Sequence, residues 1–197
     1  AYFAINKNDD ILMKSASGGV FSAVLDTYCK ENFIVFGVQF DEKFRAIHTY
    51  VDSLEDAQKY RKSKYLQSDI NDSYKNAEAF LKEGKKVIFT GTPCQIAGLR
   101  LYLRKQYDNL FCLDLVCHGV PSQSMFDKYM NYIEGKYKGE ITDFTFRHKT
   151  QDKKEKWNSK NIKFKVDGKD IIHRPNEDFY LRGFHGELFY RPSCYEC

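Results

Sequence analysis

The sequence predicts an α/β protein of mixed α+β character, in which a central, mostly parallel sheet is flanked by helices and carries an appended β-hairpin region. Apolar strand segments at 33–40, 86–90 and 110–116 are separated by segments with helical periodicity. Strands that are apolar throughout are typical of parallel sheets covered on both faces by helices. Toward the C-terminal end apolar and polar residues alternate, and Asp167-Gly168 is typical of a hairpin turn.

The individual elements follow from local patterns. Residues 16–30 have the apolar spacing of a helix, whereas FIVFGVQF at 33–40 is rich in the β-branched and aromatic residues of a buried strand. Gly84 is expected to end the helix that precedes it. The predicted helices are 16–30, a short one from Ser53, 73–83, 93–104, one after Pro121 to about Glu134, and 177–184; the predicted strands are 33–40, 45–51, 86–90, 110–116, 140–147, 161–166 and 169–173.

Length and composition indicate a globular chain with a sizeable core. The 197 residues suit one large domain, or one domain with a small appendage, and 42% of them are hydrophobic. No apolar run approaches the roughly 18 residues of a membrane span, and no secretory signal is recognisable, so we expect a cytoplasmic protein. Because the chain lacks an initial Met and ends on a CxxC pair, we also expect it to be a piece of a longer protein.

Positive charge is concentrated near the C-terminal end. Residues 147–174 contain ten Lys or Arg and four acidic residues, an excess larger than the net charge of +4 of the whole chain. Such a segment binds an anionic cofactor or nucleic acid, or it is a solvated, lysine-rich hairpin. The charge pattern leaves these interpretations open, although we expect no nucleic-acid partner.

The sharpest motif is Gly91-Thr92-Pro93-Cys94-Gln95, which joins a predicted strand to a predicted helix. Thr92 suits the N-cap, Pro93 the first helical position and Gln95 the third, which together make a capping box. Cys94 then lies in the first turn, where unpaired N–H groups and the helix dipole favour an anion. A thiol there forms a thiolate more easily and suits metal ligation or nucleophilic attack, although an inert cysteine is equally compatible with the pattern.

Three further cysteines are ligand candidates. Cys117 follows the next predicted strand at the corresponding end, so it meets Cys94 if the two strands are neighbours. Cys194 and Cys197 form a CxxC pair, which occurs in metal sites and in redox motifs. In a cytosolic chain, cysteines indicate metal binding or catalysis rather than disulfides. Four thiols suffice for a cubane iron–sulfur cluster or for a structural zinc.

The remaining cysteines and the histidines carry weaker signals. Cys29 lies on a helix face and Cys112 inside an apolar strand, so both are predicted to be small core residues. His118 beside Cys117 suggests a cysteine hydrolase, but catalytic pairs are rarely adjacent in sequence, and a pairing with Cys94 stays open. Four other histidines show no ligand spacing and are predicted to be structural or exposed: His48, His148, His173 and His185.

Two segments are candidates for phosphate contact. Lys14, Ser17, Gly18 and Gly19 precede the first long helix, where small residues let a phosphate approach the helix N-terminus. Ser-Gly-Gly in this position is also a common helix cap. The segment 63–68 (SKYLQS) is polar with one aromatic residue, and by itself it is equally typical of a surface loop.

Together these segments resemble the coenzyme F420 hydrogenase/dehydrogenase beta-subunit family, in particular its bacterial members. The elements KSASGGVFSAVL, SKYLQS, VIFTGTPCQIAGLRLYL, LDLVCHGVPS, FRHK and RPSCYEC occur in the same order as in that family. The similarity extends from about residue 10 to the end of the chain. GTPCQ, CHGVPS and RPxCxxC are its specific elements.

The resemblance implies bound FAD and a 4Fe–4S cluster. Electrons would pass between cluster and flavin, and hydride would be exchanged with a small substrate such as reduced coenzyme F420. By position, the implied cluster ligands are Cys94, Cys117, Cys194 and Cys197. The implied FAD-binding candidates are Lys14, Ser17, Gly18, Gly19, Ser63, Lys64, Gln67, Ser68, Thr90, Gly91, Thr92, Arg147 and Lys149.

The same resemblance implies an internal organisation and partners. We expect an α/β core that binds FAD and the cluster at 1–150, and a basic hairpin with the CxxC tail at 151–197, packed on that core. A ferredoxin-like module or another redox subunit is the implied protein partner, and a small redox molecule is the implied substrate.

Two other functions are compatible with the residues themselves. The four cysteines also suit a zinc-stabilised binding module without enzymatic activity, in which the basic segment meets an acidic partner. The other alternative is an enzyme with a cysteine nucleophile, built on Cys94 and His118. Metal and flavin analysis separates these three functions.

Overall fold

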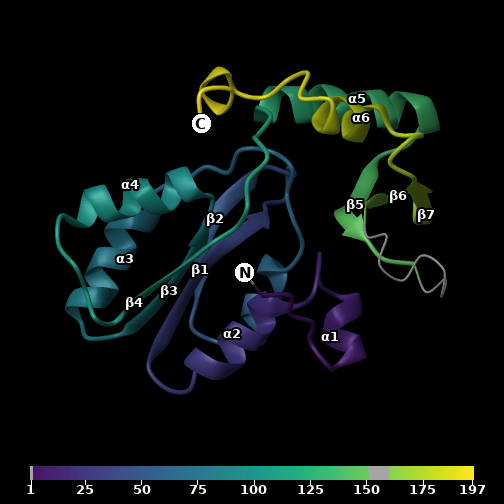
Figure 1. Ribbon diagram of the computed structural model, residues 1–197. Coiled ribbons are helices and arrows are strands. Elements are labelled where there is room, and N and C mark those ends of the chain that lie inside the picture. Colours follow the sequence, from purple (N-terminus) through teal and green to yellow (C-terminus); the bar gives the residue numbers. More distant parts are fainter. Residues whose placement is uncertain (1, 151–159) are drawn as a thin grey trace. The chain divides into compact units, whose positions relative to one another are not determined.

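A computed structural model describes residues 2–150 and 160–197 and divides the chain into two compact units (Figure 1). The first, which we call the parallel-sheet unit, comprises Phe21–Arg61 and Ser68–His118. The second, the antiparallel-sheet unit, comprises Ala1–Val20, Lys62–Gln67 and Gly119–Cys197. The charged residues predicted at 152–156 to belong to the basic segment lie outside the described residues.

The parallel-sheet unit contains a four-stranded sheet in the order β2-β1-β3-β4. Strand β3 (Lys86–Gly91) pairs in parallel with β1 (Phe33–Phe40) and with β4 (Leu110–Asp114). Strand β2 (Ala46–Val51) is antiparallel to β1 and lies at the edge. The predicted fold class, a mostly parallel sheet flanked by helices, is therefore confirmed.

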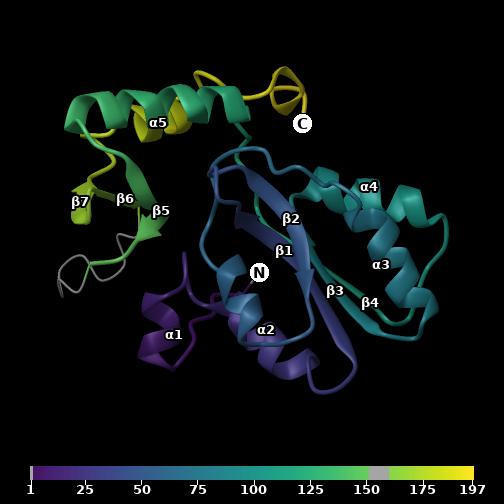
Figure 2. The same cartoon turned by 180° about the vertical axis from the view of Figure 1, so that it is seen from behind.

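Helices cover both faces of this sheet, as the apolar strands predict (Figures 1 and 2). Helices α3 (Ser73–Lys82) and α4 (Pro93–Leu103) cover one face, and α2 (Val20–Tyr28) and the 3-10 helix η1 (Asp56–Tyr60) cover the other. The first face buries Ile34, Phe36, Val87 and Phe89 with Ala77, Leu81, Ile96, Leu99 and Leu103. The second buries Val35, Val51 and Ile88 with Leu25, Cys29, Ala57 and Tyr60.

A close approach fixes η1 on the sheet. Gly37 on β1 lies under the ring of Tyr60, and a Cβ at Gly37 would come within 2.5 Å of Tyr60 Cγ. The Tyr60 hydroxyl is 2.9 Å from the Thr49 hydroxyl of β2, and burial raises the pKa of Tyr60 to about 12. Only glycine leaves room for the ring at this position of the strand.

The antiparallel-sheet unit contains a three-stranded sheet in the order β5-β6-β7. Its strands are β5 (Ile141–His148), β6 (Asn161–Val166) and β7 (Lys169–His173), and its helices are α1 (Asp9–Met13), α5 (Gln123–Tyr137), α6 (Phe179–His185) and the 3-10 helix η2 (Pro192–Cys194). Asp167 and Gly168 join β6 to β7 with φ of 46° and 78°, so the predicted hairpin turn is confirmed.

Two helices differ from the sequence prediction. The helix predicted at 16–30 begins only at Val20, because Ser15 to Gly19 form a loop in which Gly19 has φ of 77°. Helix α1 was not predicted, since five residues are too few to show a helical period; the Asn8 side chain caps it by accepting from Asp10 N and Ile11 N. Among the described helices, none combines the length and the apolar character that crossing a bilayer requires.

Aromatic side chains form the interior of the antiparallel-sheet unit. Phe126, Tyr129, Phe144, Phe146 and Tyr180 are all nearly inaccessible to solvent. Their ring centroids lie between 4.9 and 6.1 Å apart in a connected set of contacts. Aromatic pairs at these distances and tilted angles add to the free energy of burial.

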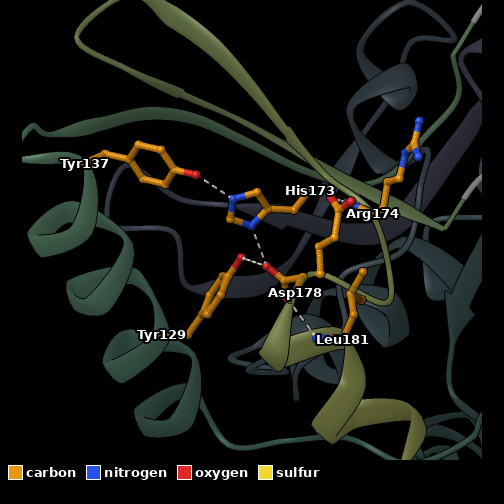
Figure 3. Close-up of polar contacts among 7 residues, drawn as sticks. Tyr129, Tyr137, His173, Arg174, Asp178 and Leu181 are labelled. Atoms are coloured by element: carbon orange, nitrogen blue, oxygen red, sulfur yellow. Dashed lines mark hydrogen bonds and ion pairs between the residues drawn. The ribbon is translucent and has the colours of Figure 1, made fainter.

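A buried polar network links β7 to α5 and α6 inside this aromatic interior (Figure 3). Asp178 is 1% exposed; its Oδ2 accepts from the Tyr129 hydroxyl at 2.6 Å and lies 2.8 Å from His173 Nδ1. Its Oδ1 accepts from Leu181 N, which caps α6. The Tyr137 hydroxyl lies 2.8 Å from His173 Nε2. His173 is thus a structural residue, as the sequence predicts.

Burial and the Asp178 carboxylate raise the pKa of Tyr129 far above its usual range, so this tyrosine stays a hydrogen-bond donor. We predict that Asp178→Ala lowers the free energy of unfolding by about 3 kcal/mol, because three buried donors lose their common acceptor. Urea unfolding of the full chain measures this. The matched control is Asp170→Asn on the exposed hairpin, which is expected to leave stability nearly unchanged. Equal stability of the two variants would contradict the role given to Asp178.

Candidate functional site

In the parallel-sheet unit, the carboxyl ends of β3 and β4 lie side by side. Gly91 is in register with Asp114, and Leu115 N donates to Gly91 O at 3.1 Å. The two strands that precede Cys94 and Cys117 are therefore parallel neighbours, as the predicted convergence requires. Both cysteines follow the same edge of the sheet and are exposed. Open sheets bind ligands at this kind of edge.

The start of α4 holds Cys94 in the first helical turn. Thr92, Pro93 and Gln95 occupy the N-cap, first and third positions, as predicted, and Gln95 Oε1 accepts from Thr92 N at 3.0 Å. The Thr92 hydroxyl is 3.1 Å from Cys94 Sγ. The Tyr74 hydroxyl donates to Gln95 O at 2.7 Å, and burial together with nearby Cys94 raises the pKa of Tyr74. Cys94 thus has a fixed backbone and a hydroxyl at its sulfur.

The other cysteines differ sharply in exposure. Cys194 in η2 is partly exposed and Cys197 is exposed, so both sulfurs of the CxxC pair are accessible to a metal. Cys29 is buried, and burial raises its pKa to about 11. Cys112 packs against the α3–α4 face of the sheet, and burial raises its pKa as well. The prediction of a core residue is confirmed for Cys29, whereas Cys112 is partly exposed at the margin of the core.

The four ligand candidates divide between the units, with Cys94 and Cys117 in one and Cys194 and Cys197 in the other. Across residues 2–150 and 160–197, no three His, Cys, Asp or Glu side chains are grouped so that they could hold a metal ion. The donor type nevertheless fits an iron–sulfur cluster, because each unit supplies two thiols outside its core. The complete ligand set remains a prediction.

The antiparallel-sheet unit gathers positive charge between segments that are distant in sequence. We call the following residues the basic cluster: Lys62, Lys64, Arg147, His148, Lys149 and Lys163. Burial and Lys62 lower the pKa of Lys64 to about 7. Burial, Lys62 and Lys163 lower the pKa of His148. Burial and neighbouring cations thus disfavour the charged forms, whereas Asp143 opposes this effect at Lys62 and Asp170 opposes it at His148. Asp170 Oδ2 also lies 2.7 Å from Lys163 Nζ.

Two members of the basic cluster hold the Ser15–Gly19 loop by its carbonyl groups. The Lys149 ammonium donates to Leu12 O and to Ser17 O, each at 2.7 Å. The Arg147 guanidinium donates to Ala16 O from Nε at 3.3 Å and from Nη2 at 3.1 Å. Burial, Arg147 and Lys62 lower the pKa of Lys149, whereas its two carbonyl contacts stabilise the ammonium group. The basic side chains therefore shape the glycine loop.

The glycines of that loop have separate structural reasons. A Cβ at Gly18 would lie 2.3 Å from Ala4 O, so the close approach of another backbone segment requires glycine there. Gly19 has φ of 77°, a conformation that favours glycine, and it immediately precedes α2. Ser15 Oγ donates to Ile11 O at 2.6 Å and completes the turn. Specific contacts thus fix the conformation of the loop that precedes α2.

The remaining FAD-binding candidates lie in different settings. In the antiparallel-sheet unit, Lys14, Ser17 and Gln67 are exposed, and Ser63 is half-buried. In the parallel-sheet unit, the Thr90 hydroxyl donates to Phe36 O at 2.9 Å, and the Ser68 hydroxyl is buried beside His48. Gly91 is also buried.

Sequence reasoning missed several residues that the structure places at these sites. Lys62 directly precedes the SKYLQS segment and His148 lies within FRHK, so adjacency to a motif was the available signal. Lys163 is one of ten Lys or Arg residues at 147–174, and nothing in the sequence distinguishes it from the others. His48 gave no signal at all, because a single histidine in a strand has no ligand spacing, yet its ring nitrogens contact Thr90 O and Ser68 Oγ.

The fold and these two sites define a mixed α/β protein with exposed thiols at a parallel-sheet edge and a separate cationic site. Residues 84–197 match the family described as the C terminus of the coenzyme F420 hydrogenase/dehydrogenase beta subunit, and the chain belongs to this family. The matched region contains all four cysteine candidates and the basic residues of β5. The resemblance inferred from the sequence motifs is thereby confirmed.

A solved structure has a similar fold. It is a chain of the xenon-derivatised F420-reducing NiFe hydrogenase complex from Methanosarcina barkeri, with a TM-score of 0.57 and 19% sequence identity. The match covers 100% of the present chain and 66% of that chain, so the chain spans about two thirds of its length. At this identity the likeness shows the fold alone. No curated protein matches the sequence.

The contacts of Lys149 predict a measurable effect on the glycine loop. Replacing Lys149 by Met removes two charge-assisted hydrogen bonds from Leu12 O and Ser17 O, so the loop is expected to open more often. Hydrogen–deuterium exchange of peptides covering 12–19 should therefore become faster than in the unchanged protein. Lys165→Met, on the neighbouring strand, is the control. Unchanged exchange at 12–19 in Lys149→Met would show that the loop holds its shape without this side chain.

Proposed function

We propose that the chain is a flavin- and cluster-binding module of an oxidoreductase, in which the basic cluster holds the diphosphate of FAD. The observation that carries this proposal is the grouping of Lys62, Lys64 and His148, whose pKa values are lowered first by burial and then by neighbouring cations, while Asp143 opposes this at Lys62 and Asp170 at His148. An anionic ligand would add to the counter-charge that Asp143 and Asp170 already supply, and would further stabilise the charged forms of these side chains. A diphosphate supplies two neighbouring negative groups of the required sign.

Geometry supports a division of labour among the FAD-binding candidates. Lys149 and Arg147 shape the loop through its carbonyls, while Ser17 on the loop is exposed shortly before the start of α2. Lys64 supplies a cation close to Lys62. Thr90 and Ser68 have hydroxyls buried in the parallel-sheet unit, so we assign them to positioning rather than to direct contact with FAD.

For the cluster, we propose the ligands Cys94, Cys117, Cys194 and Cys197. The support from this structure is local: accessible thiols, the start of α4 beside Cys94, and the hydroxyl of Thr92 at its sulfur. A helix N-terminus favours the thiolate that ligation requires. When bound, FAD supplies hydride exchange with a small substrate, and a 4Fe–4S cluster supplies single-electron transfer. The chain's own residues bind and orient both groups.

Substrate and partner follow from the family alone. A coenzyme F420-like molecule is the proposed hydride donor or acceptor, and a ferredoxin-like module or another redox subunit is the proposed partner. Family membership of residues 84–197 supports this proposal.

The decisive experiment is flavin and metal analysis of the full-length protein prepared without oxygen. We expect bound FAD together with iron and sulfide, visible in the absorption spectrum. Stoichiometric zinc without flavin would instead support the zinc-stabilised binding module. Absence of flavin, iron and zinc, combined with rapid alkylation of Cys94, would support the cysteine-nucleophile enzyme. Any of these last outcomes overturns the proposed function.

A charge-removing variant tests the basic cluster directly. Lys64→Met is expected to weaken FAD binding roughly tenfold or more, because a charge-assisted contact to the diphosphate is lost. Fluorescence quenching of FAD during titration measures the affinity. Lys128→Met on the exposed face of α5 removes the same charge away from the cluster and serves as the control. If both variants bind FAD like the unchanged protein, the diphosphate lies elsewhere.

The basic cluster also predicts a pH dependence of FAD binding. Because burial and Lys62 lower the pKa of Lys64 to about 7, this residue loses its proton above that pH in the free protein. A bound diphosphate raises the pKa of Lys64, so binding takes up a proton, and affinity falls by up to about tenfold per pH unit above pH 7. Lys64→Arg keeps its charge and should lose this component. Equal pH profiles of the two proteins would refute proton uptake at Lys64.

A further inference from the structure

A chain of hydrogen bonds begins at His48, deep inside the parallel-sheet unit. His48 on β2 is 2% exposed, and its ring stacks on Phe89 with centroids 5.6 Å apart. Its Nε2 is 3.1 Å from Thr90 O, and its Nδ1 is 3.0 Å from Ser68 Oγ. A carbonyl oxygen only accepts, so Nε2 carries the proton. Burial lowers the pKa of His48 to about 4, so the ring is neutral and Nδ1 accepts from Ser68.

The direction of this first bond fixes the direction of the others. Ser68 Oγ uses its hydrogen toward His48 and accepts from Gln95 Nε2 at 2.9 Å. The Gln95 amide can therefore present only Oε1 to the helix start, where it accepts from Thr92 N at 3.0 Å. A rotated amide would bring its NH₂ group against the Thr92 N–H and leave both donors without an acceptor. Only this arrangement gives every polar atom in this series of hydrogen bonds a partner.

The chain of hydrogen bonds ends at Cys94. Thr92 N is held by Gln95, and the Thr92 hydroxyl lies 3.1 Å from Cys94 Sγ. Glycine suits the turn, since a Cβ at Gly91 would come 3.2 Å from Gln95 Oε1, which is closer than an ordinary contact. A hydrogen bond from a hydroxyl to sulfur stabilises the thiolate and alters the reduction potential of a cluster that it ligates.

We propose that His48 is a positioning residue for the Cys94 sulfur, acting through Ser68 and Gln95 on the turn that carries Thr92. The chemical consequence rests on the proposed function, because it matters most when Cys94 ligates a cluster. The position of the sulfur and the reactivity of the metal-free thiol do not depend on that function. A histidine that only filled the core would have no effect at Cys94.

The test uses the full-length protein in its metal-free form, with site-resolved alkylation of Cys94 by iodoacetamide at pH 7. His48→Phe keeps the ring and its stacking but removes both nitrogen contacts; it is expected to slow alkylation about tenfold. Thr92→Val is expected to have the same effect at the last link. His48→Gln restores an amide donor toward Thr90 O and an acceptor for Ser68, so it should return the rate close to that of the unchanged protein.

Two further variants separate positioning from general stability. Thr49→Val removes a partly buried hydrogen bond to Tyr60 at the residue next to His48, on the opposite face of β2, and it should destabilise the unit while leaving Cys94 alkylation unchanged. Ser68→Ala interrupts the chain with a smaller change in volume, so it decides the question if His48→Phe does not fold. Unchanged alkylation of Cys94 in folded His48→Phe or Ser68→Ala overturns the proposal.

The cluster-loaded protein gives a separate readout. Loss of the hydroxyl contact in Thr92→Val, and of its support in His48→Phe, is expected to shift the cluster midpoint potential to more negative values, because a hydrogen bond to sulfur favours the reduced state. If the protein takes up no iron, the proposed function fails, while the alkylation rates still decide whether His48 positions Cys94. If iron binds and neither potential nor alkylation changes, the positioning role fails alone.

Discussion

Parallel pairing of β3 on both sides is the interaction on which the parallel-sheet unit depends. Because β3 lies between β1 and β4, its Val87, Ile88 and Phe89 are buried on both faces, and each face needs its own helices. Helix α2 supplies one cover, and α3 with α4 supplies the other. The same pairing aligns the carboxyl ends of β3 and β4, so the segments that carry Cys94 and Cys117 leave from one edge.

Buried polar groups fix the start of a helix in both units. Asp178 caps α6 while it accepts from Tyr129 and faces His173. His48 reaches the start of α4 through Ser68 and Gln95. A buried polar atom without a partner costs free energy, so each network tolerates only the arrangement in which all its atoms are paired. One network stabilises an aromatic interior, and the other ends beside an exposed thiol.

Electrostatics separates the cations of the antiparallel-sheet unit into two roles. Lys149 and Arg147 donate to carbonyl oxygens of the Ser15–Gly19 loop, and Lys149 also donates to Leu12 O. Lys62 and Lys64 keep lowered pKa values that arise from burial and from neighbouring positive charge. Burial disfavours the charged forms of this second pair, so an anionic ligand would stabilise them. The two pairs of cations therefore differ in their surroundings, although all four residues belong to the basic cluster.

The sequence by itself determined the local features of this protein. The strand at 33–40, the hairpin turn at Asp167-Gly168 and the capping box before Cys94 were predictable because each depends on neighbouring residues and their backbone preferences. Family membership was also predictable, since its motifs are short and contiguous. The helix start at Val20 was missed, because a loop held from a distant strand replaces the predicted first turn.

Tertiary structure alone decided which distant residues act together. Nothing local joins Lys62 and Lys64 to the end of β5, or His48 to Ser68 and Gln95. Periodicity reports how a segment forms a helix or a strand, whereas these contacts depend on how strands pair and which loops they bring together. That is why the candidate thiols could be identified from the sequence. The buried series of hydrogen bonds from His48 to the turn before Cys94 could not.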